Sequence, residues 1–143
     1  MPKSSRQSGA TPKDYVVFIS HSSRDAWIAR QIGKEIEAVG AKKWLDEHDL
    51  KGGDDVRNNI IAGIRACREV VLVLSPASVQ SHWVSIEIGA ALGQRKRVTP
   101  ILNNVSATEM GPLQGIRALL LNEFDDFLVD LKRRLDHWTV RDK

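Results

Sequence analysis

The stretch YVVFIS, Tyr15 to Ser20, decides the fold, because it is an unbroken apolar run that ends in a polar residue. EVVLVLS, at residues 69–75, repeats the pattern: it is apolar from Val70 to Leu74 and then ends in serine. Apolar runs without polar alternation are typical of strands that are covered on both faces, as in a parallel sheet beneath helices. Shorter runs predict two further strands, at residues 98–102 and 118–121, and KKWLDE predicts a weaker one anchored by Trp44.

Helical patterns lie between these runs. Ser22 and Asp25 have the spacing of a capping box, and the helix that follows carries an apolar face and stops at Gly40 as a C′ residue. Three further helices are expected: one capped by Asp54 or Asp55, one over residues 81–92 and one over residues 124–135. The apolar face of the first helix comprises Ile28, Ile32, Ile36 and Val39, and that of the second comprises Val56, Ile60 and Ile64. The segment 103–115 is expected to be irregular.

Strands and helices therefore alternate along the chain. With right-handed crossovers, this order predicts an α/β, flavodoxin-like fold of three layers: a five-stranded parallel sheet in the order 2-1-3-4-5, with helices on both faces. The domain is expected over residues 14–137. A Ser-, Pro- and Gly-rich tail precedes it at residues 1–13, and a short tail follows it at residues 138–143.

Composition excludes several classes of function. The net charge of +3 comes entirely from the first 13 residues, because the rest of the chain carries 18 basic and 18 acidic side chains. A nucleic-acid-binding or membrane-binding face is therefore not expected. The single cysteine, Cys67, excludes an internal disulfide, and no apolar run approaches the ~20 residues of a membrane span. We expect a cytoplasmic protein.

Glu87 is the main candidate for chemistry. It is the one carboxylate in SHWVSIEIGAAL, residues 81–92, an otherwise largely apolar helix. Ligands of doubly wound folds bind outside the carboxyl ends of the strands, at the switch point between the first and third strands, and this helix follows directly on the third. The alternative is a narrow solvated stripe, because Gln80 and Gln94 fall close to Glu87 on a helical wheel.

Other polar features have plainer interpretations. LDEHDLKGGDD, residues 45–55, lacks the ligand periodicity of a calcium loop, so a surface loop is favoured over a cation site. His21 follows Ser20 directly, and a turn or capping role is favoured over a role as a base for a nucleophile. The scattered histidines form no metal motif, and no Gly-rich phosphate loop follows the first strand. No metal or cofactor is expected.

Taken together, these motifs resemble a Toll/interleukin-1 receptor (TIR) domain of bacterial type. The resemblance covers residues 14–135 and rests on three motifs: FISHS at the first strand end, D-x-x-x-L-x-x-G at residues 46–53, and S-x-W-x-x-x-E at residues 81–87. The resemblance implies the flavodoxin-like sheet already predicted. It also implies one of two functions, since some members are scaffolds that recruit other TIR domains, whereas others cleave NAD+ between nicotinamide and ribose with one glutamate on the third helix.

Glu87 stands at the position of that glutamate, which favours an NAD+ nucleosidase that releases nicotinamide and linear or cyclic ADP-ribose. NAD+ is then the substrate, and self-association or other TIR proteins are the expected partners, in bacterial immunity. The substrate-binding candidates are Ser20, His21, Trp44, Asp46, Ser75 and Trp83. The loop expected to act as a lid or assembly element includes Glu47, Asp49, Leu50, Gly52 and Gly53. A non-catalytic TIR scaffold is the alternative, and a nucleoside deoxyribosyltransferase-like enzyme is a more remote one.

Overall fold

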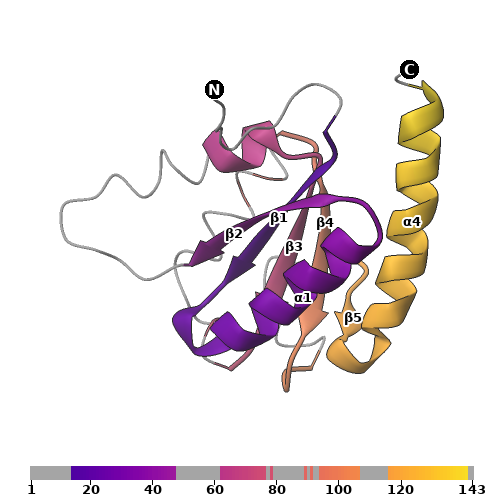
Figure 1. Cartoon of the computed structure of the whole chain (residues 1–143). Helices are drawn as coiled ribbons and strands as arrows, with labels where there is room; N and C mark the ends of the chain where they lie inside the picture. Colours follow the sequence, from indigo (N-terminus) through magenta and orange to yellow (C-terminus); the bar gives the residue numbers. More distant parts are fainter. Residues whose placement is uncertain are drawn as a thin grey trace.

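The computed structural model describes residues 14–47, 62–76, 78, 89, 91, 94–106 and 116–141. Five strands form one sheet in the order β2-β1-β3-β4-β5 (Figure 1). Every pair of neighbours is parallel, so the predicted order and direction are confirmed. The strands are β1 (Val16–His21), β2 (Lys42–Glu47), β3 (Glu69–Leu74), β4 (Arg97–Leu102) and β5 (Leu119–Leu120).

Helices cover both faces of the sheet, as predicted. The first face carries α1 (Ala26–Ala38) and α4 (Phe124–Arg141), whose apolar side chains form one core cluster with alternate residues of the strands, such as Ile19 and Val71. The intervening strand residues, such as Phe18 and Leu72, point to the opposite face, where they pack with Ile64 and Ala91. Residues 62–66 are helical, and the backbone at 89 and 91 is helical too. The predicted starts of these two helices lie outside the described residues.

Gly40 ends α1 as the sequence predicts. Its φ of 112° lies in the left-handed region that glycine adopts without steric cost. The N–H of Gly40 donates to the carbonyl of Glu37 at 3.0 Å, and the N–H of Ala41 donates to that of Ile36 at 3.3 Å. These two bonds form a Schellman motif, which satisfies carbonyls that would otherwise lack partners at the helix end.

The closing helix α4 is longer than the pattern at residues 124–135 predicts. It continues past residue 137, into the expected tail, and ends at Arg141. Trp138 holds this extension against the sheet: its ring meets that of Tyr15 edge-on, with centroids 5.8 Å apart, and the guanidinium carbon of Arg68 lies 4.2 Å from its centroid. The last turns of α4 therefore pack at the amino end of β1.

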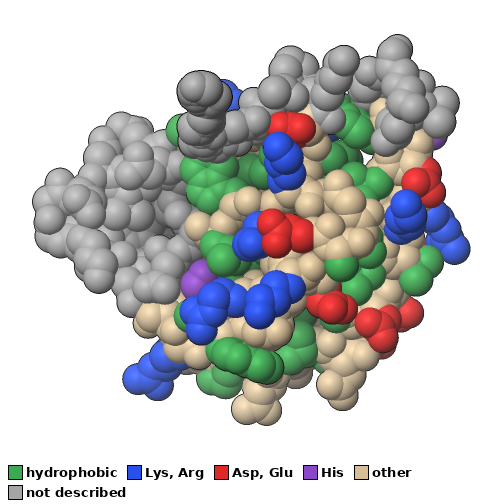
Figure 2. All heavy atoms as spheres, in the orientation of Figure 1, with side chains coloured by type: hydrophobic (Ala, Val, Ile, Leu, Met, Phe, Trp, Pro, Cys, Tyr) green, Lys and Arg blue, Asp and Glu red, His purple; other side chains and the backbone are tan. Residues whose placement is uncertain are grey.

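Charged side chains of both signs are interspersed over the face of the molecule that carries α1 (Figure 2).

Within the described ranges, no helix is long and apolar enough to cross a bilayer.

Candidate functional site

The strand ends at the expected switch point carry buried polar side chains. Ser20 is fully buried near the end of β1, where it is the register partner of Asp46 in β2, and Ser75 follows directly on β3. Polar groups at the carboxyl ends of neighbouring parallel strands are typical of ligand sites in doubly wound sheets. The structure therefore brings Ser20 and Ser75 to one edge of the sheet, as predicted.

A buried carboxylate, that of Asp25, joins the loops that follow β1 and β3. Its Oδ2 accepts hydrogen bonds from the hydroxyl of Ser75 at 2.6 Å and from that of Ser22 at 2.9 Å. Asp25 is the last residue of the short 3-10 helix η1 (Ser23–Asp25) and is only 5% exposed. Hydrogen bonds to an ionised acceptor are roughly twice as strong as neutral ones, so this carboxylate fixes the two loops relative to each other. We call the contacts among Ser22, Asp25 and Ser75 the Asp25 bracket.

This arrangement corrects the interpretation of Ser22 and Asp25 as a capping box. Neither Ser22, at the start of η1, nor Asp25, at the start of α1, makes a side-chain capping bond. The spacing is that of a capping box, but the motif requires each side chain to bond the other residue's backbone N–H. Here the carboxylate of Asp25 turns inward because Ser75, fifty residues later in the chain, offers it a buried hydroxyl.

Ser78 stabilises the turn after β3. Its Oγ accepts the N–H of Ser75 at 2.9 Å and lies 3.2 Å from the carbonyl oxygen of Val73, to which it donates. Its own N–H donates to the carbonyl of Ser75 at 3.0 Å. Ser78 is fully buried. The turn thus holds Ser75 in one position through bonds to its backbone N–H and to its carbonyl.

His21 lies on the other face of the sheet from Ser20, because successive strand residues point to opposite faces. Its Nδ1 lies 2.8 Å from the carbonyl oxygen of Ser22. A carbonyl oxygen only accepts, so Nδ1 carries the hydrogen in this contact. The structure therefore separates His21 from Ser20 and gives it the local turn contact that was favoured over a role as a base for a nucleophile.

Trp44 lies on the face opposite α1. It is half-buried and packs against the core cluster that contains Phe18 and Leu72. Its ring contacts that of Phe18, its register partner in β1, with centroids 6.2 Å apart and an angle of 42° between the ring planes. Gly63 lies against both rings, since a Cβ built there would come within 2.8 Å of Phe18 and 3.3 Å of Trp44. Trp44 is thus anchored at the core and is only partly buried.

A second buried carboxylate lies at the opposite, amino-terminal edge of the sheet, where no site was expected. Glu69, the first residue of β3, is fully buried. It accepts two hydrogen bonds from Arg134 of α4, from Nε and Nη2, each at 2.9 Å, and a third from the hydroxyl of Tyr15. Burial and the neighbouring Glu69 carboxylate raise the pKa of Tyr15 to about 12. Glu69 lies just before the predicted apolar run, so the sequence pattern did not indicate its burial.

The described residues offer no constellation for metal binding or for a thiol nucleophile. No group of three or more His, Cys, Asp or Glu side chains among them could hold a metal ion. Cys67 is buried, and burial raises the pKa of its thiol to about 12, so that it stays protonated and unreactive in the folded protein.

The fold and the matched sequence identify the family. A profile of the TIR domain matches residues 17–134, which is most of the chain. This chain belongs to the TIR domain family. The recognition from FISHS, D-x-x-x-L-x-x-G and S-x-W-x-x-x-E is thereby confirmed.

Similar TIR proteins include several with named activities. The chain is 28% identical over 105 residues to a 2′ cyclic ADP-D-ribose synthase, AbTIR, of Acinetobacter baumannii, a match covering 70% of this chain and 39% of the relative. It is 31% identical over 106 residues to the NAD(+) hydrolase PdTIR of Paracoccus denitrificans, covering 71% and 35%. The matched TIR region thus spans less than half the length of these relatives.

Solved TIR structures have the same fold. A metazoan TIR-STING receptor from C. gigas, in complex with 2′,3′-cGAMP, superposes with a TM-score of 0.68 at 26% identity and covers 86% of this chain and 41% of its own. The TIR domain of the Toll-related receptor TRR-2 from Hydra magnipapillata gives a TM-score of 0.59 at 20% identity and covers 84% and 97%. The flavodoxin-like fold class is thus confirmed.

Several residues predicted for the TIR site lie outside the described residues. These are Glu87, Trp83, Asp49, Leu50, Gly52 and Gly53, together with the side chains of Asp46 and Glu47. Their roles stay predictions. The described part of the site consists of Ser20, Trp44 and the Asp25 bracket, whose central carboxylate was not among the predicted site residues.

Proposed function

We propose that this TIR domain cleaves the glycosidic bond between nicotinamide and ribose in NAD+, with Glu87 as the catalytic carboxylate. The observation that carries the proposal is the similarity to TIR proteins named as NAD(+) hydrolases and 2′ cyclic ADP-D-ribose synthases, each matched over about 70% of this chain. Glu87 lies within the residues matched to the family. NAD+ is a substrate in this proposal, and no resident cofactor or metal is invoked.

The chemistry needs one carboxylate. As the bond from ribose C1′ to the nicotinamide nitrogen breaks, its electron pair leaves with nicotinamide and the ribose becomes oxocarbenium-like. Nicotinamide departs as a neutral molecule, so no general acid is required. The negative charge of Glu87 stabilises the developing cation, and its effect is strengthened where apolar neighbours such as Trp83 exclude water. Attack by water then gives ADP-ribose and a proton, whereas attack by a hydroxyl of the same molecule gives a cyclic product and a proton.

The described residues at the strand ends would position the nucleotide. The hydroxyl proton of Ser75 is donated to Asp25, so Ser75 offers its oxygen lone pairs to a ligand and suits a ribose hydroxyl better than a phosphate. Trp44, which is only partly buried, would stack on a base. Asp46, beside Ser20 in the register, would hold the floor of the site.

Self-association is the second part of the proposal. The loop from Glu47 to Asp54 of one domain would close over the site of another, and Gly52 and Gly53 suit such a moving segment. Activity per molecule should then rise with enzyme concentration. We place this activity in the cytoplasm, within bacterial immunity, as the resemblance implies.

The test is chromatography of NAD+ incubated with the purified chain over a wide range of protein concentrations, with and without a crowding agent. The catalytic interpretation predicts loss of NAD+ with stoichiometric release of nicotinamide, abolished in Glu87→Ala and in the near-isosteric Glu87→Gln. Glu35→Ala, which removes an exposed carboxylate from α1, is the matched control and should retain full activity. Mass spectrometry distinguishes linear from cyclic ADP-ribose, because the cyclic form lacks the added water.

Intact NAD+ at concentrations where gel filtration shows self-association would favour the alternative, a non-catalytic TIR scaffold. Activity per molecule that does not change with concentration would refute the assembly step alone, since a monomer would then contain a complete site.

A further inference from the structure

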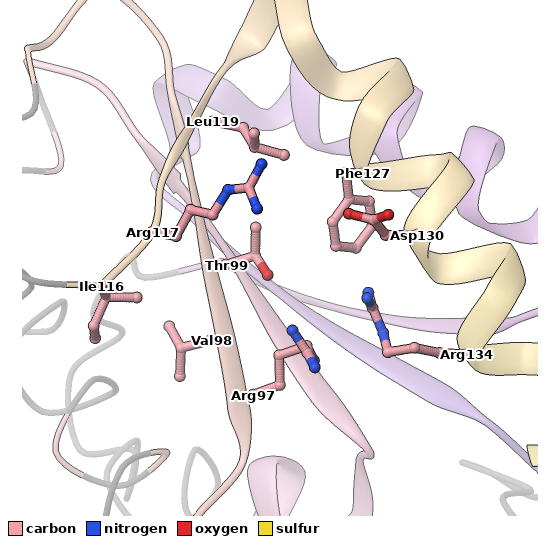
Figure 3. A pocket seen from close by; sticks show the side chains of 9 residues that line it. All are labelled: Arg97, Val98, Thr99, Ile116, Arg117, Leu119, Phe127, Asp130 and Arg134. Atoms are coloured by element: carbon pink, nitrogen blue, oxygen red, sulfur yellow. The ribbon is translucent and has the colours of Figure 1, made fainter.

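A basic pocket lies between β4, the segment leading into β5, and α4 (Figure 3). Its lining does not include Ser20 or Ser75. Its volume is about 240 Å³. Arg97, which opens β4 at the amino-terminal edge of the sheet, lies at one end of it.

Three guanidinium groups surround this pocket, from three different elements: Arg97 from β4, Arg117 from the segment before β5 and Arg134 from α4 (Figure 3). Within the part of the chain that the structure describes, the lining contains one carboxylate, Asp130, which pairs with Arg133 on the outer side of α4 at 3.3 Å. Arg134 is itself paired with the buried Glu69, so the uncompensated positive charge of the lining comes from Arg97 and Arg117. Like charges around one cavity repel each other, and a bound anion relieves that repulsion.

The arginines keep donors available for such an anion. Arg134 uses Nε and one Nη2 hydrogen on Glu69, and these two bonds fix its guanidinium in place. Arg97 and Arg117 make no ion pair with any described residue. The hydroxyl of Thr99 lies among the three guanidinium groups (Figure 3). The site therefore combines Arg134, which Glu69 holds in place, with Arg97 and Arg117, which have no ion pair among the described residues. This combination suits an anion.

We propose that this pocket binds the phosphate or pyrophosphate group of a small metabolite. Guanidinium groups match phosphate oxygens in bidentate fashion, and a group with several anionic oxygens can engage arginines that come from three directions, which one planar carboxylate cannot. The volume is below the ~300 Å³ at which pockets begin to enclose drug-sized ligands, so a phosphate-bearing fragment fits and a whole dinucleotide does not.

The apolar part of the pocket lining favours an anion that carries an organic group. Phe127, Ile116 and Leu119 contribute apolar wall beside the guanidinium groups. The proposal does not depend on NAD+ cleavage, because the pocket lining includes neither Ser20 nor Ser75 and the test below measures binding alone.

The test is isothermal titration of the full chain with inorganic pyrophosphate, with inorganic phosphate as the smaller probe. We expect saturable one-to-one binding that weakens as sodium chloride is raised, and tighter binding of pyrophosphate than of phosphate. Arg97→Gln and Arg117→Gln should each weaken binding by about tenfold or more, the effect of losing one charge-assisted contact. Arg30→Gln, which removes an exposed arginine from α1 outside the pocket, should leave the affinity unchanged.

Arg97 and Arg117 are both exposed, so their substitution should not unfold the domain, and thermal melting of each variant checks this. Amide NMR shifts give a second readout: the signal of Thr99 should shift with pyrophosphate in the unmodified protein, and the midpoint of this shift should move to at least about tenfold higher pyrophosphate in Arg97→Gln. Absence of saturable binding, or equal weakening in all three variants including Arg30→Gln, would overturn the proposal.

Discussion

Replacing Arg134 by methionine should destabilise this domain severely, because it leaves a buried charge without its partner. Glu69 is fully buried and accepts two of its three hydrogen bonds from Arg134. Removing one partner of a buried ion pair typically costs about 3–5 kcal/mol, whereas the pair as a whole contributes little net stability. For a domain of this size, that loss corresponds to a fall in Tm of roughly 10–20 °C.

The same reasoning predicts a strong coupling between the two positions. Glu69→Gln keeps the shape and one acceptor but removes the charge, so we expect a loss of about 1–2 kcal/mol. In the double variant no charge is left buried, so Arg134→Met should cost less in the presence of Glu69→Gln than alone, by about 2 kcal/mol. Arg133→Met is the matched control, because the neighbouring Arg133 is exposed and its surface pair with Asp130 contributes about 0–1 kcal/mol.

Urea unfolding measures these differences, followed by circular dichroism and by tryptophan fluorescence to check that both report one transition. A loss below about 1 kcal/mol in Arg134→Met, or strict additivity in the double variant, would refute the dependence of the Glu69 charge on Arg134. If Arg134→Met alone does not fold, recovery of folding in the double variant still tests the coupling.

Three further outcomes follow from the described contacts. Asp25→Ala should lower the free energy of unfolding by about 3 kcal/mol in urea, because two hydrogen bonds to a charged acceptor disappear. It should also lower NAD+ cleavage more than the exposed control Asp136→Ala does, and equal effects of the two substitutions would contradict the Asp25 bracket. Tyr15 is the only tyrosine, so the tyrosinate absorbance of the folded protein should titrate near pH 12. Because its pKa in the folded state exceeds the unfolded value of about 10, the contribution of Tyr15 to stability should be constant below pH 10 and should be lost between pH 10 and 12. An absorbance midpoint near pH 10 would contradict the burial of Tyr15 beside Glu69. The single thiol, Cys67, should react with a disulfide reagent only after unfolding, and rapid reaction in the native state would contradict its burial.

The sheet could be predicted because the signals that specify its strands are local. The runs at Tyr15 and Val70 lack polar alternation, which is the pattern of strands covered on both faces, and Gly40 marks a helix end by its own backbone chemistry. Such signals can be recognised in a single sequence. The strand order followed from the handedness of the connections, which does not depend on side-chain detail.

The carboxylates were harder to interpret because their partners are distant in the chain. Asp25 has the spacing of a cap from Ser22, three residues away, but its role is set by Ser75. Glu69 begins an apolar strand and looks like an exposed edge residue until Arg134, sixty-five residues later, is brought beside it. A local sequence pattern shows which contacts a residue can make with its neighbours in the chain. Its burial and its charge pairing depend on residues that come close only when the sheet has assembled.

The two buried carboxylates have different roles at the two edges of the sheet. At the amino-terminal edge, Glu69 is held by a bidentate arginine and a tyrosine, and these contacts fix α4 in place. At the carboxyl edge, Asp25 accepts hydrogen bonds from two small hydroxyls on loops, an arrangement that needs no large side chain. Side chains that are kept available for a ligand contribute little to packing of the core. A fold with such a binding edge therefore needs its stabilising contacts elsewhere. Loss of the Glu69 pair should therefore lower stability without changing nicotinamide release from the fraction that stays folded, whereas loss of Asp25 should change both.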